Sequence, residues 1–434
     1  MLTLPKKNTR GFTVRFYLLL LATLFLTLSA CISAEESAQL SQNNLVAQAS
    51  LLLEEDESPP VNLQIGTNAW FQSNTKLLSS FELEIEEGTA EDQFPIYWIR
   101  PKRNTFRSPP RYHFLFFYTK SSIFFDKSVT DILATFFEKD IPVDAFAVLS
   151  ENPQSIQEAL NRLNRPNIDL IFTMGSDATA FVHETYQQGD IPVVTVLSKD
   201  PVLLGQMPDY EQGSGNHITY TSVGVPIDVQ MSYFKQLIPD LKHIAVLYGK
   251  QNSSAVETQV EPLRKYAQKE NINIIDVAVE DRTQVVEELD LLMPEAIRQM
   301  SQSDPEMKHS IFLITGSSSV SNALDLVDEL AQKIPVVTLL PNLVQESKIS
   351  PVFGIGVNFD SNSKLAAKYA FDILEGQMLP SDLPVGVIAP PDLAINFAEA
   401  RKIGLKIPFR FFESASTIYG PDRRALRLQG KIVE

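Results

Sequence analysis

Cysteine is almost absent from this 434-residue chain, and histidine and tryptophan are scarce. The single cysteine, Cys31, cannot form a disulfide within the chain, and the five histidines show no spacing typical of metal ligands. Motifs of the forms Gly-x-Gly-x-x-Gly and Gly-x-Ser-x-Gly, and the phosphate-loop lysine motif, are missing as well. The sequence therefore gives little support to catalysis, and we expect neither a metal nor a cofactor.

Positive charge is also in short supply. The chain has 37 Lys and Arg against 53 Asp and Glu, a formal net charge of -16, and residues 1–31 contain four of the basic residues and no acidic one. The remainder is thus more acidic still, and such a surface repels nucleic acid and anionic membranes. We expect no nucleic-acid partner. The length and the hydrophobic content of 44% predict two or three domains with large cores.

No apolar run is long enough to cross a bilayer. After a basic segment that ends at Arg15, residues 16–28 form a run of 13 apolar and small residues, followed by Ser-Ala-Cys at 29–31. A membrane-spanning helix needs about 20 residues, so residues 1–31 are predicted to be an export signal rather than a membrane anchor. Residues 32–60, rich in Ser, Gln, Asn and Glu, are predicted to be a flexible tether.

The export signal resembles the lipobox of bacterial lipoproteins. The resemblance implies that Cys31 becomes the first residue of the mature protein and carries acyl chains such as palmitate, which hold it in a lipid bilayer. Ile32, rather than Asp, follows the cysteine. In a bacterium with two membranes, this would favour the outer one.

Residues 61–110 are predicted to form a small β-rich extension of unknown role. Within it, FELEIEE from Phe81 alternates apolar and acidic residues, and FPIYWIRP from Phe94 has the composition of another strand.

From Tyr112 onward, short continuous apolar runs alternate with amphipathic stretches of about 12 residues. Continuous apolar runs are typical of parallel strands that helices cover on both faces, so the fold class is predicted to be α/β. The predicted strands lie at 112–118, 143–149, 168–174, 191–197, 243–249, 272–279, 310–316, 334–340 and 352–357.

One predicted strand–helix–strand unit occurs twice in the sequence. IFTMGSDATAF from Ile171 precedes IPVVTV, and FLITGSSSVSN from Phe312 precedes IPVVTL. IPVV alone is a common way to begin a buried strand, but the matching Gly-Ser junctions favour an internal duplication. We therefore expect two lobes, each with its own parallel sheet. Their strand ends would face one cleft, where a ligand could bind.

The chain from about 112 to 420 resembles the ABC-transporter substrate-binding proteins whose relatives include tryptophan and tyrosine binders. The segments that carry the resemblance are DLIFTMGSDATAFV, IPVVTVLSKDPVLLGQM, YFKQLIPDLKHIAVLYGKQNSSA, GIGVNFDSNSKLAAKYAFDILEGQMLPSDLPV and AINFAEARKIGLKIP. It implies a hinged, two-lobed type I periplasmic-binding fold. Lobe 1 would comprise 112–224 and 358–382, lobe 2 would comprise 225–357 and 383–420, and 421–434 would be a C-terminal tail.

In the first lobe, residues 176–179 follow a predicted strand and open a helix. The helix amides and the hydroxyls of Ser176 and Thr179 could hold a carboxylate, although Ser176 or Asp177 could equally be ordinary helix caps. Asp177 stands where the family usually has Pro and would repel an anionic ligand. Asp200 matches the family's Asp-Pro and could bind a ligand amine, or it could be a turn residue before Pro201.

In the second lobe, Asn252, Ser253 and Ser254 could contact a small polar ligand or cap a helix. Ser317 and Ser318 repeat the Ser176 arrangement. Asn358 stands where relatives usually have Asp, so a negative charge is missing. Tyr118, Phe124 and Phe125 could stack on a flat ligand, although core packing is the commoner role of such aromatics.

The sequence thus predicts an extracytoplasmic, lipid-anchored protein that captures a small organic ligand, an amino acid or a related metabolite, and presents it to an ABC permease. The alternative is a ligand-sensing or envelope-regulatory lipoprotein whose membrane partner is not a transporter. The departures at Asp177 and Asn358 and the extra span 61–110 motivate this alternative.

Overall fold

The computed structural model describes residues 71, 83–88, 96–101, 106, 108–151, 153, 155–163, 167–280, 283–347 and 349–433. All of them belong to one compact unit, Thr67–Glu434. The predicted export signal, tether and lipidation site therefore lie outside the described residues. Among the helices of the described ranges, none is both long and apolar enough to cross a membrane.

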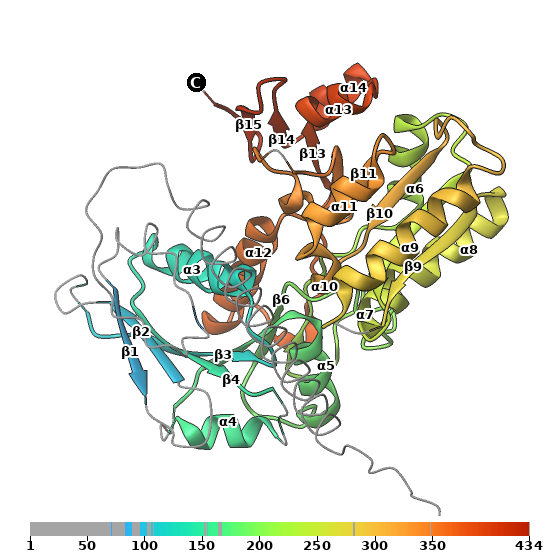
Figure 1. Cartoon of the computed structure of the whole chain (residues 1–434). Helices are drawn as coiled ribbons and strands as arrows, with labels where there is room; N and C mark the ends of the chain where they lie inside the picture. The colour runs from blue at the N-terminus through green and yellow to red at the C-terminus, as the bar shows by residue number, and fades with distance from the viewer. Residues whose placement is uncertain are drawn as a thin grey trace, which may run out of the picture. The chain divides into compact units, whose positions relative to one another are not determined.

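The predicted strands form two separate sheets rather than one (Figure 1). The first has seven strands in the order β1-β2-β4-β3-β5-β6-β7. Its strands β3 to β7 run parallel, and β1 and β2 extend it antiparallel through β4. The bounds are β1 Leu83–Gly88, β2 Ile96–Pro101, β3 Tyr112–Tyr118, β4 Val143–Leu149, β5 Leu170–Met174, β6 Val193–Val196 and β7 Ile218–Thr219.

The second sheet has nine strands in the order β16-β15-β14-β13-β12-β11-β10-β8-β9. Strands β8 to β12 are parallel, and β13 joins them antiparallel. The bounds are β8 His243–Gly249, β9 Asn273–Val279, β10 Ser310–Ile314, β11 Val336–Thr338, β12 Phe353–Gly356, β13 Asp392–Asn396, β14 Thr417–Tyr419, β15 Ala425–Leu428 and β16 Lys431–Ile432. The nine strands predicted from Tyr112 onward are thus confirmed.

Helices cover both faces of each sheet, as the continuous apolar runs predict. On the first sheet, α3 (Ile123–Phe137) and α12 (Phe359–Leu374) pack on one face, and α4 (Ile156–Arg162) and α5 (Gly175–Thr185) on the other. On the second sheet, one face is covered by α6 (Ile227–Leu237), α8 (Glu261–Glu270), α13 (Phe397–Ile403) and α14 (Phe409–Ser414). The other is covered by α9 (Val285–Met300), α10 (Ser318–Ser321) and α11 (Leu324–Ala331).

The repeated unit appears once in each sheet and with the same register. In the first sheet, β5 pairs with β6 so that Thr173 lies beside Thr195. In the second sheet, β10 pairs with β11 so that Ile314, the counterpart of Thr173, lies beside Thr338. The connecting helix differs, because α5 is continuous whereas α10 and α11 are two short helices.

The chain passes between the two cores three times. Val223 packs in the first core and Val225 in the second, and the return near 357 leads from Ile355 in the second core to Phe359 in the first. The third crossing leads from Val385 in the first lobe to Leu393 in the second core. Contacts of the first lobe extend past the expected boundary at 382, since Val385 lies in its core and Gly386 forms a β-bridge with Thr221. We use "lobe 1" and "lobe 2" for the two sheets with their helices.

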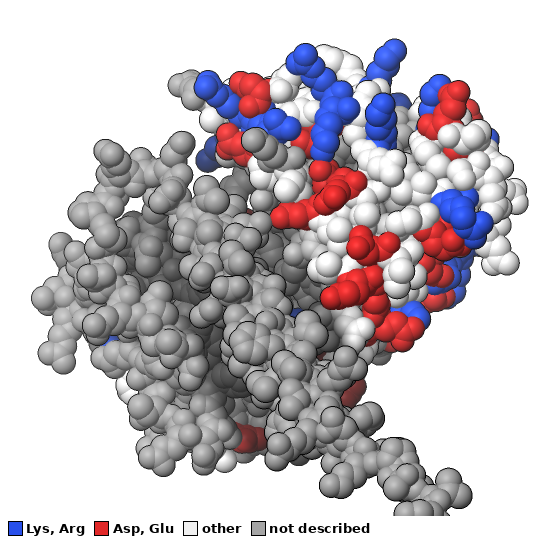
Figure 2. All heavy atoms as spheres, viewed as in Figure 1, with Lys and Arg blue, Asp and Glu red and all other residues white. Residues whose placement is uncertain are grey.

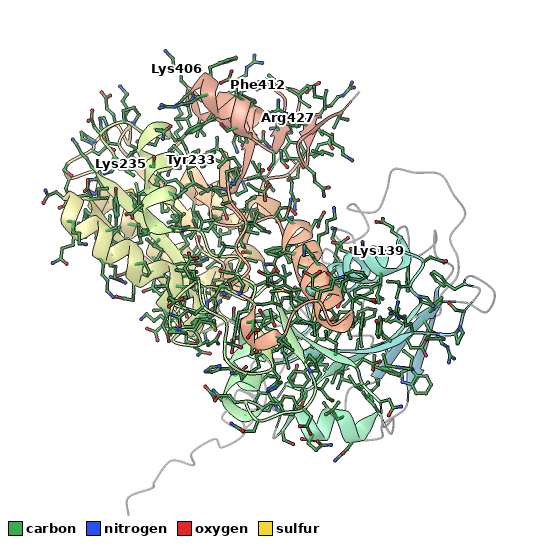
Figure 3. All side chains as sticks on the ribbon, turned by 180° about the vertical axis from the view of Figure 1, so that it is seen from behind. Lys139, Tyr233, Lys235, Lys406, Phe412 and Arg427 are labelled. Carbon is green, nitrogen blue, oxygen red and sulfur yellow. The ribbon has the colours of Figure 1, made fainter. Side chains whose placement is uncertain are left out.

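Residues 421–434, which the sequence suggests are a tail, contain β15 and β16 at the edge of the second sheet. The Arg427 guanidinium donates to the carbonyl oxygens of Phe412 and Ala415, near the end of α14, and lies 5.5 Å from the centroid of the Phe412 ring (Figure 3). Lys and Arg side chains gather over the elements that Figure 1 labels α13, α14 and β15 (Figure 2).

Substitution of Gly175 tests the packing at the junction between β5 and α5. Its φ of +84° lies in the left-handed region, and a Cβ there would stand 2.4 Å from Cζ of Phe125. Gly376 also has a positive φ, +67°, but nothing within 4 Å of its Cβ position. We expect Gly376→Ala to cost about 1 kcal/mol of unfolding free energy, and Gly175→Ala about 1–3 kcal/mol more because the ring must shift. Urea unfolding measures both, and equal losses would contradict this packing.

Candidate functional site

The first turn of α5 lies directly after β5, and its side chains point to several different partners. The helix begins at Gly175 with Met174 as its N-cap and no side-chain cap, so capping by Ser176 or Asp177 is wrong. Ser176 Oγ instead accepts a hydrogen bond of 3.0 Å from the backbone N–H of Lys199. Thr179 is buried, with its hydroxyl 2.9 Å from that of Thr173.

Lys199 follows β6 and reaches from lobe 1 into lobe 2. Its Nζ donates a 3.1 Å hydrogen bond to Ser254 Oγ at the start of α7 (Ser253–Ala255). Its stem passes close to Gly316, where a Cβ would stand 3.2 Å from Lys199 Cε. The absence of a side chain at Gly316 thus leaves room for the lysine to cross between the lobes.

The ammonium of Lys199 sits in an unfavourable electrostatic environment. Burial, and secondarily the positive charge of Lys120, lowers the pKa of Lys199 from 10.5 to about 8, and the negative charge of Asp177 raises it. Lys120 and Asp177 themselves form an ion pair, with Nζ and Oδ2 2.7 Å apart. The carboxylate that would repel an anionic ligand is therefore largely balanced by a neighbouring cation.

Asp200 is buried at the same strand end, and its carboxylate already has partners. Its Oδ1 accepts from the backbone N–H groups of Val202 and Leu203, and its Oδ2 accepts from the Tyr210 hydroxyl. Asp200 therefore serves as a turn residue beside Pro201. Burial, and secondarily the hydrogen bond to Asp200, raises the pKa of the Tyr210 hydroxyl, so that group stays a donor.

A cavity of about 220 Å³ lies where the two lobes and the crossing segments meet. Lobe 1 supplies Lys199, Asp200 and Tyr210, and lobe 2 supplies Thr258 and Gln259. The rest of the lining is mostly apolar and comes from the crossing near 223–226 and from lobe 2, among them Val223, Val225, Ile227, Leu339 and Ile355. An apolar wall with a few polar groups from opposite sides is the usual composition of a small-molecule site.

The other residues predicted in lobe 2 lie next to this cavity rather than in its lining. Asn252 caps α7 by accepting from the N–H of Ala255, and it also accepts from Ser254 Oγ, while Ser253 is exposed. Ser317 is buried and accepts from the N–H of Gly249. Ser317, Ser318 and Asn252 line a separate recess of only about 10 Å³.

The remaining predicted residues are part of the framework. Tyr118 is fully buried and donates to Asp126, and Phe124 packs edge-on against Phe359, so both contribute to packing within lobe 1. Asn358 caps α12, and its backbone N–H donates to Asp392 Oδ2. A carboxylate therefore stands beside Asn358, although the sequence position itself has none.

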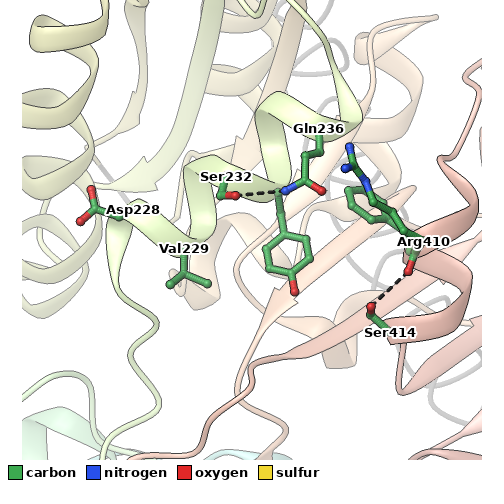
Figure 4. Close-up of a pocket in the computed structure, with 8 residues that line it drawn as sticks. Asp228, Val229, Ser232, Gln236, Arg410 and Ser414 are labelled. Carbon is green, nitrogen blue, oxygen red and sulfur yellow. Dashed lines mark hydrogen bonds between the residues drawn. The ribbon is translucent and has the colours of Figure 1, made fainter.

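A second hollow, of about 360 Å³, is a groove between α6 and α14 in lobe 2 (Figure 4). Its lining includes Asp228, Gln236, Arg410 and Ser414, and all of it belongs to lobe 2. Two of its polar side chains already form hydrogen bonds within their own helices: Gln236 donates to Ser232, and Ser414 donates to the carbonyl oxygen of Arg410. This groove does not join the two lobes.

Sequence reasoning missed Lys199, Tyr210, Thr258 and Gln259. A signal for Lys199 was present, because it directly precedes Asp200 in the strand-end segment SKDPV. Gln259 had no such signal. It lies in the π-helical segment Val256–Val260, and its Oε1 accepts from the N–H of Gly316, 57 residues away.

Comparison of the sequence with known protein families finds a match. The model of the ABC transporter substrate binding protein family matches residues 138–418. No curated protein sequence matches the chain.

Three solved structures are similar over most of their length. The ABC domain of a Streptococcus pneumoniae protein in complex with L-Trp has 20% identity and a TM-score of 0.56, covering 70% of this chain and 99% of that one. A conserved domain protein from Vibrio cholerae has 19% identity and a TM-score of 0.56, covering 71% and 99%. The ligand-free, open structure of a substrate-binding protein with adhesive properties from Clostridium difficile has 20% identity and a TM-score of 0.52, covering 70% and 98%. The fold is the two-lobed type I periplasmic-binding fold.

The lysine that crosses between the lobes gives a pH prediction. Opening the lobes exposes Lys199 and restores its pKa toward 10.5, so between about 8 and 10.5 the open form binds more protons than the closed form. The closed population of the unliganded protein should therefore rise with pH through this window. Lys199→Met should abolish that rise, while Lys333→Met, which changes an exposed lysine, should keep it. Small-angle scattering across the window measures the change in radius, and an unaltered response in Lys199→Met would contradict the assignment.

Proposed function

Because the chain belongs to the ABC transporter substrate-binding protein family, we propose that it captures a small organic ligand between its two lobes and delivers it to an ABC importer outside the cytoplasm. The single observation that carries this proposal is the cavity lined from both lobes, next to which Lys199 contacts Ser254. A ligand in this place stabilises the closed form because it contacts both lobes at once. The permease then recognises the closed form.

The ligand is an amino acid or a related metabolite with an anionic group. Ser254 offers Lys199 a neutral hydroxyl, and a buried ammonium is better stabilised by a carboxylate. The cavity of about 220 Å³ is smaller than the roughly 300–1,000 Å³ of sites for drug-sized molecules, which favours a compact ligand. Asp200 is already hydrogen-bonded to backbone and Tyr210, so it orders the site rather than binding a ligand amine.

The alternative, a ligand-sensing or envelope-regulatory lipoprotein without a transporter, is motivated by Asp177, Asn358 and the extra span 61–110. The ion pair of Asp177 with Lys120 and the carboxylate of Asp392 beside Asn358 weaken that motive, because both positions have a compensating charge. Stimulation of a permease's ATPase activity by the liganded protein favours import.

A ligand test separates the function from the charge assignment. We expect small amino acids or related carboxylates to raise thermal stability, by about 2.7 kcal/mol at a concentration 100-fold above Kd. The matching amides should stabilise less, and Lys199→Met should remove this preference. Thermal unfolding with acid and amide pairs gives both comparisons. Stabilisation by no small ligand would contradict the binding function, whereas equal stabilisation by acid and amide would contradict only the role of Lys199.

We also propose that Cys31 carries the acyl chains that hold the protein in a membrane, the outer one in a two-membrane bacterium. The support is the sequence of residues 1–31, with a basic segment, an apolar run and a single cysteine in order.

Cys31→Ala should abolish incorporation of labelled palmitate and prevent processing to the mature form. Metabolic labelling of the cells and mass spectrometry of the N-terminus measure both effects. Cys31→Ala protein that still carries label would show that the lipid is attached elsewhere.

A further inference from the structure

The last 34 residues reverse the charge of the rest of the chain. Residues 401–434 contain eight Lys or Arg and three Asp or Glu, whereas residues 1–400 contain 29 and 50. Figure 2 shows basic side chains gathered over α13, α14 and β15, in the part of lobe 2 that these residues build. An acidic protein thus has one locally basic surface.

This surface also exposes aromatic rings. Phe409 is 75% exposed and Phe412 36% exposed, and their rings stack with centroids 6.2 Å apart. Phe412 also contacts Phe397 of α13. Exposed phenylalanines next to each other are unusual on the solvent-exposed surface of a protein and mark an interaction site when they form a patch.

Basic side chains lie near these rings. Arg401 lies one helical turn after Phe397 on the same face of α13, and Arg427 lies over the Phe412 ring. Lys406 precedes α14, and Figure 3 shows Lys406, Phe412 and Arg427 together in this part of lobe 2. Among the described residues, Arg401 and Lys406 have no carboxylate within ion-pair distance. Both side chains are exposed.

The edge strand adds an apolar residue to the same face. Ile432 on β16 pairs with Arg427 on β15, so the two side chains share one face of the sheet, and Ile432 is 76% exposed. We call Arg401, Lys406, Phe409, Phe412, Arg427 and Ile432 the α14 patch.

We propose that the α14 patch docks lobe 2 onto a bilayer surface that contains anionic phospholipid. Apolar side chains flanked by Lys and Arg match the boundary between headgroups and acyl chains, where rings enter the interface and cations remain at the phosphates. The charge complementarity is local, because the remaining surface is acidic and is repelled by the same lipids. Docking through this patch therefore orients the protein as well as binding it.

The experiment compares variants of the full chain, all with Cys31→Ala so that no acyl chain contributes. Vesicles of phosphatidylcholine with and without phosphatidylglycerol are the probe, and co-flotation gives the partition coefficient. Each cation near the surface contributes about fivefold, so Arg401→Gln with Lys406→Gln should lower partitioning onto phosphatidylglycerol vesicles about 25-fold. Phe409→Ser should lower it as well, and added salt should weaken binding of the parent but act less on the double variant.

Matched controls change equally exposed residues elsewhere. Lys269→Gln with Lys333→Gln removes two cations outside the α14 patch, and Leu291→Ser removes a side chain that is 75% exposed on α9. Both controls should partition like the parent. The N-terminal segment is the same in every protein, so differences between variants report the patch. Equal partitioning of the patch variants and the controls would overturn the proposal.

Discussion

Burial of both faces of both sheets is the constraint on which this structure depends. Strands such as β5 and β8 are buried at every position, so their side chains cannot carry polar chemistry except at their ends. The polar residues Ser176, Lys199 and Ser254 all lie just beyond the end of a strand. Because the sheets are separate, the two sets of strand ends can approach each other, and Lys199 spans the space between them.

The two copies of the duplicated unit use a glycine at the same position for different reasons. Gly175 and Gly316 occupy equivalent positions after β5 and β10. At Gly175 the positive φ and the Phe125 ring both exclude a side chain, whereas at Gly316 the approach of Lys199 and Gln259 leaves little room for one. A glycine required for the turn in one lobe is thus used in the other to let a side chain from the opposite lobe enter.

The sequence predicted the strands well because each is a continuous apolar run with a clear boundary. The short strands β7, β13 and β14 gave no such signal, and β15 and β16 were hidden in a stretch with the composition of a tail. The candidate site was predicted less well. The strand-end rule located Ser176, Asp200 and Ser254 but could not tell a ligand contact from a turn or a helix cap. That distinction depends on partners distant in sequence, such as Tyr210 for Asp200 and Lys199 for Ser254.

Charge is arranged in this chain by local compensation rather than by its net value. Asp177 is balanced by Lys120, and the amide at Asn358 has the carboxylate of Asp392 beside it. The same reasoning applied to the whole surface explains why a formal charge of -16 does not decide which surfaces the protein can approach. Fields of exposed charges are screened beyond about 8–10 Å at physiological salt, so a membrane near α14 interacts with Arg401 and Lys406 more strongly than with distant carboxylates. The ligand cavity is lined by the crossings and the strand ends, and the α14 patch shares no residue with it. Ligand capture and surface docking can therefore be altered separately by substitution.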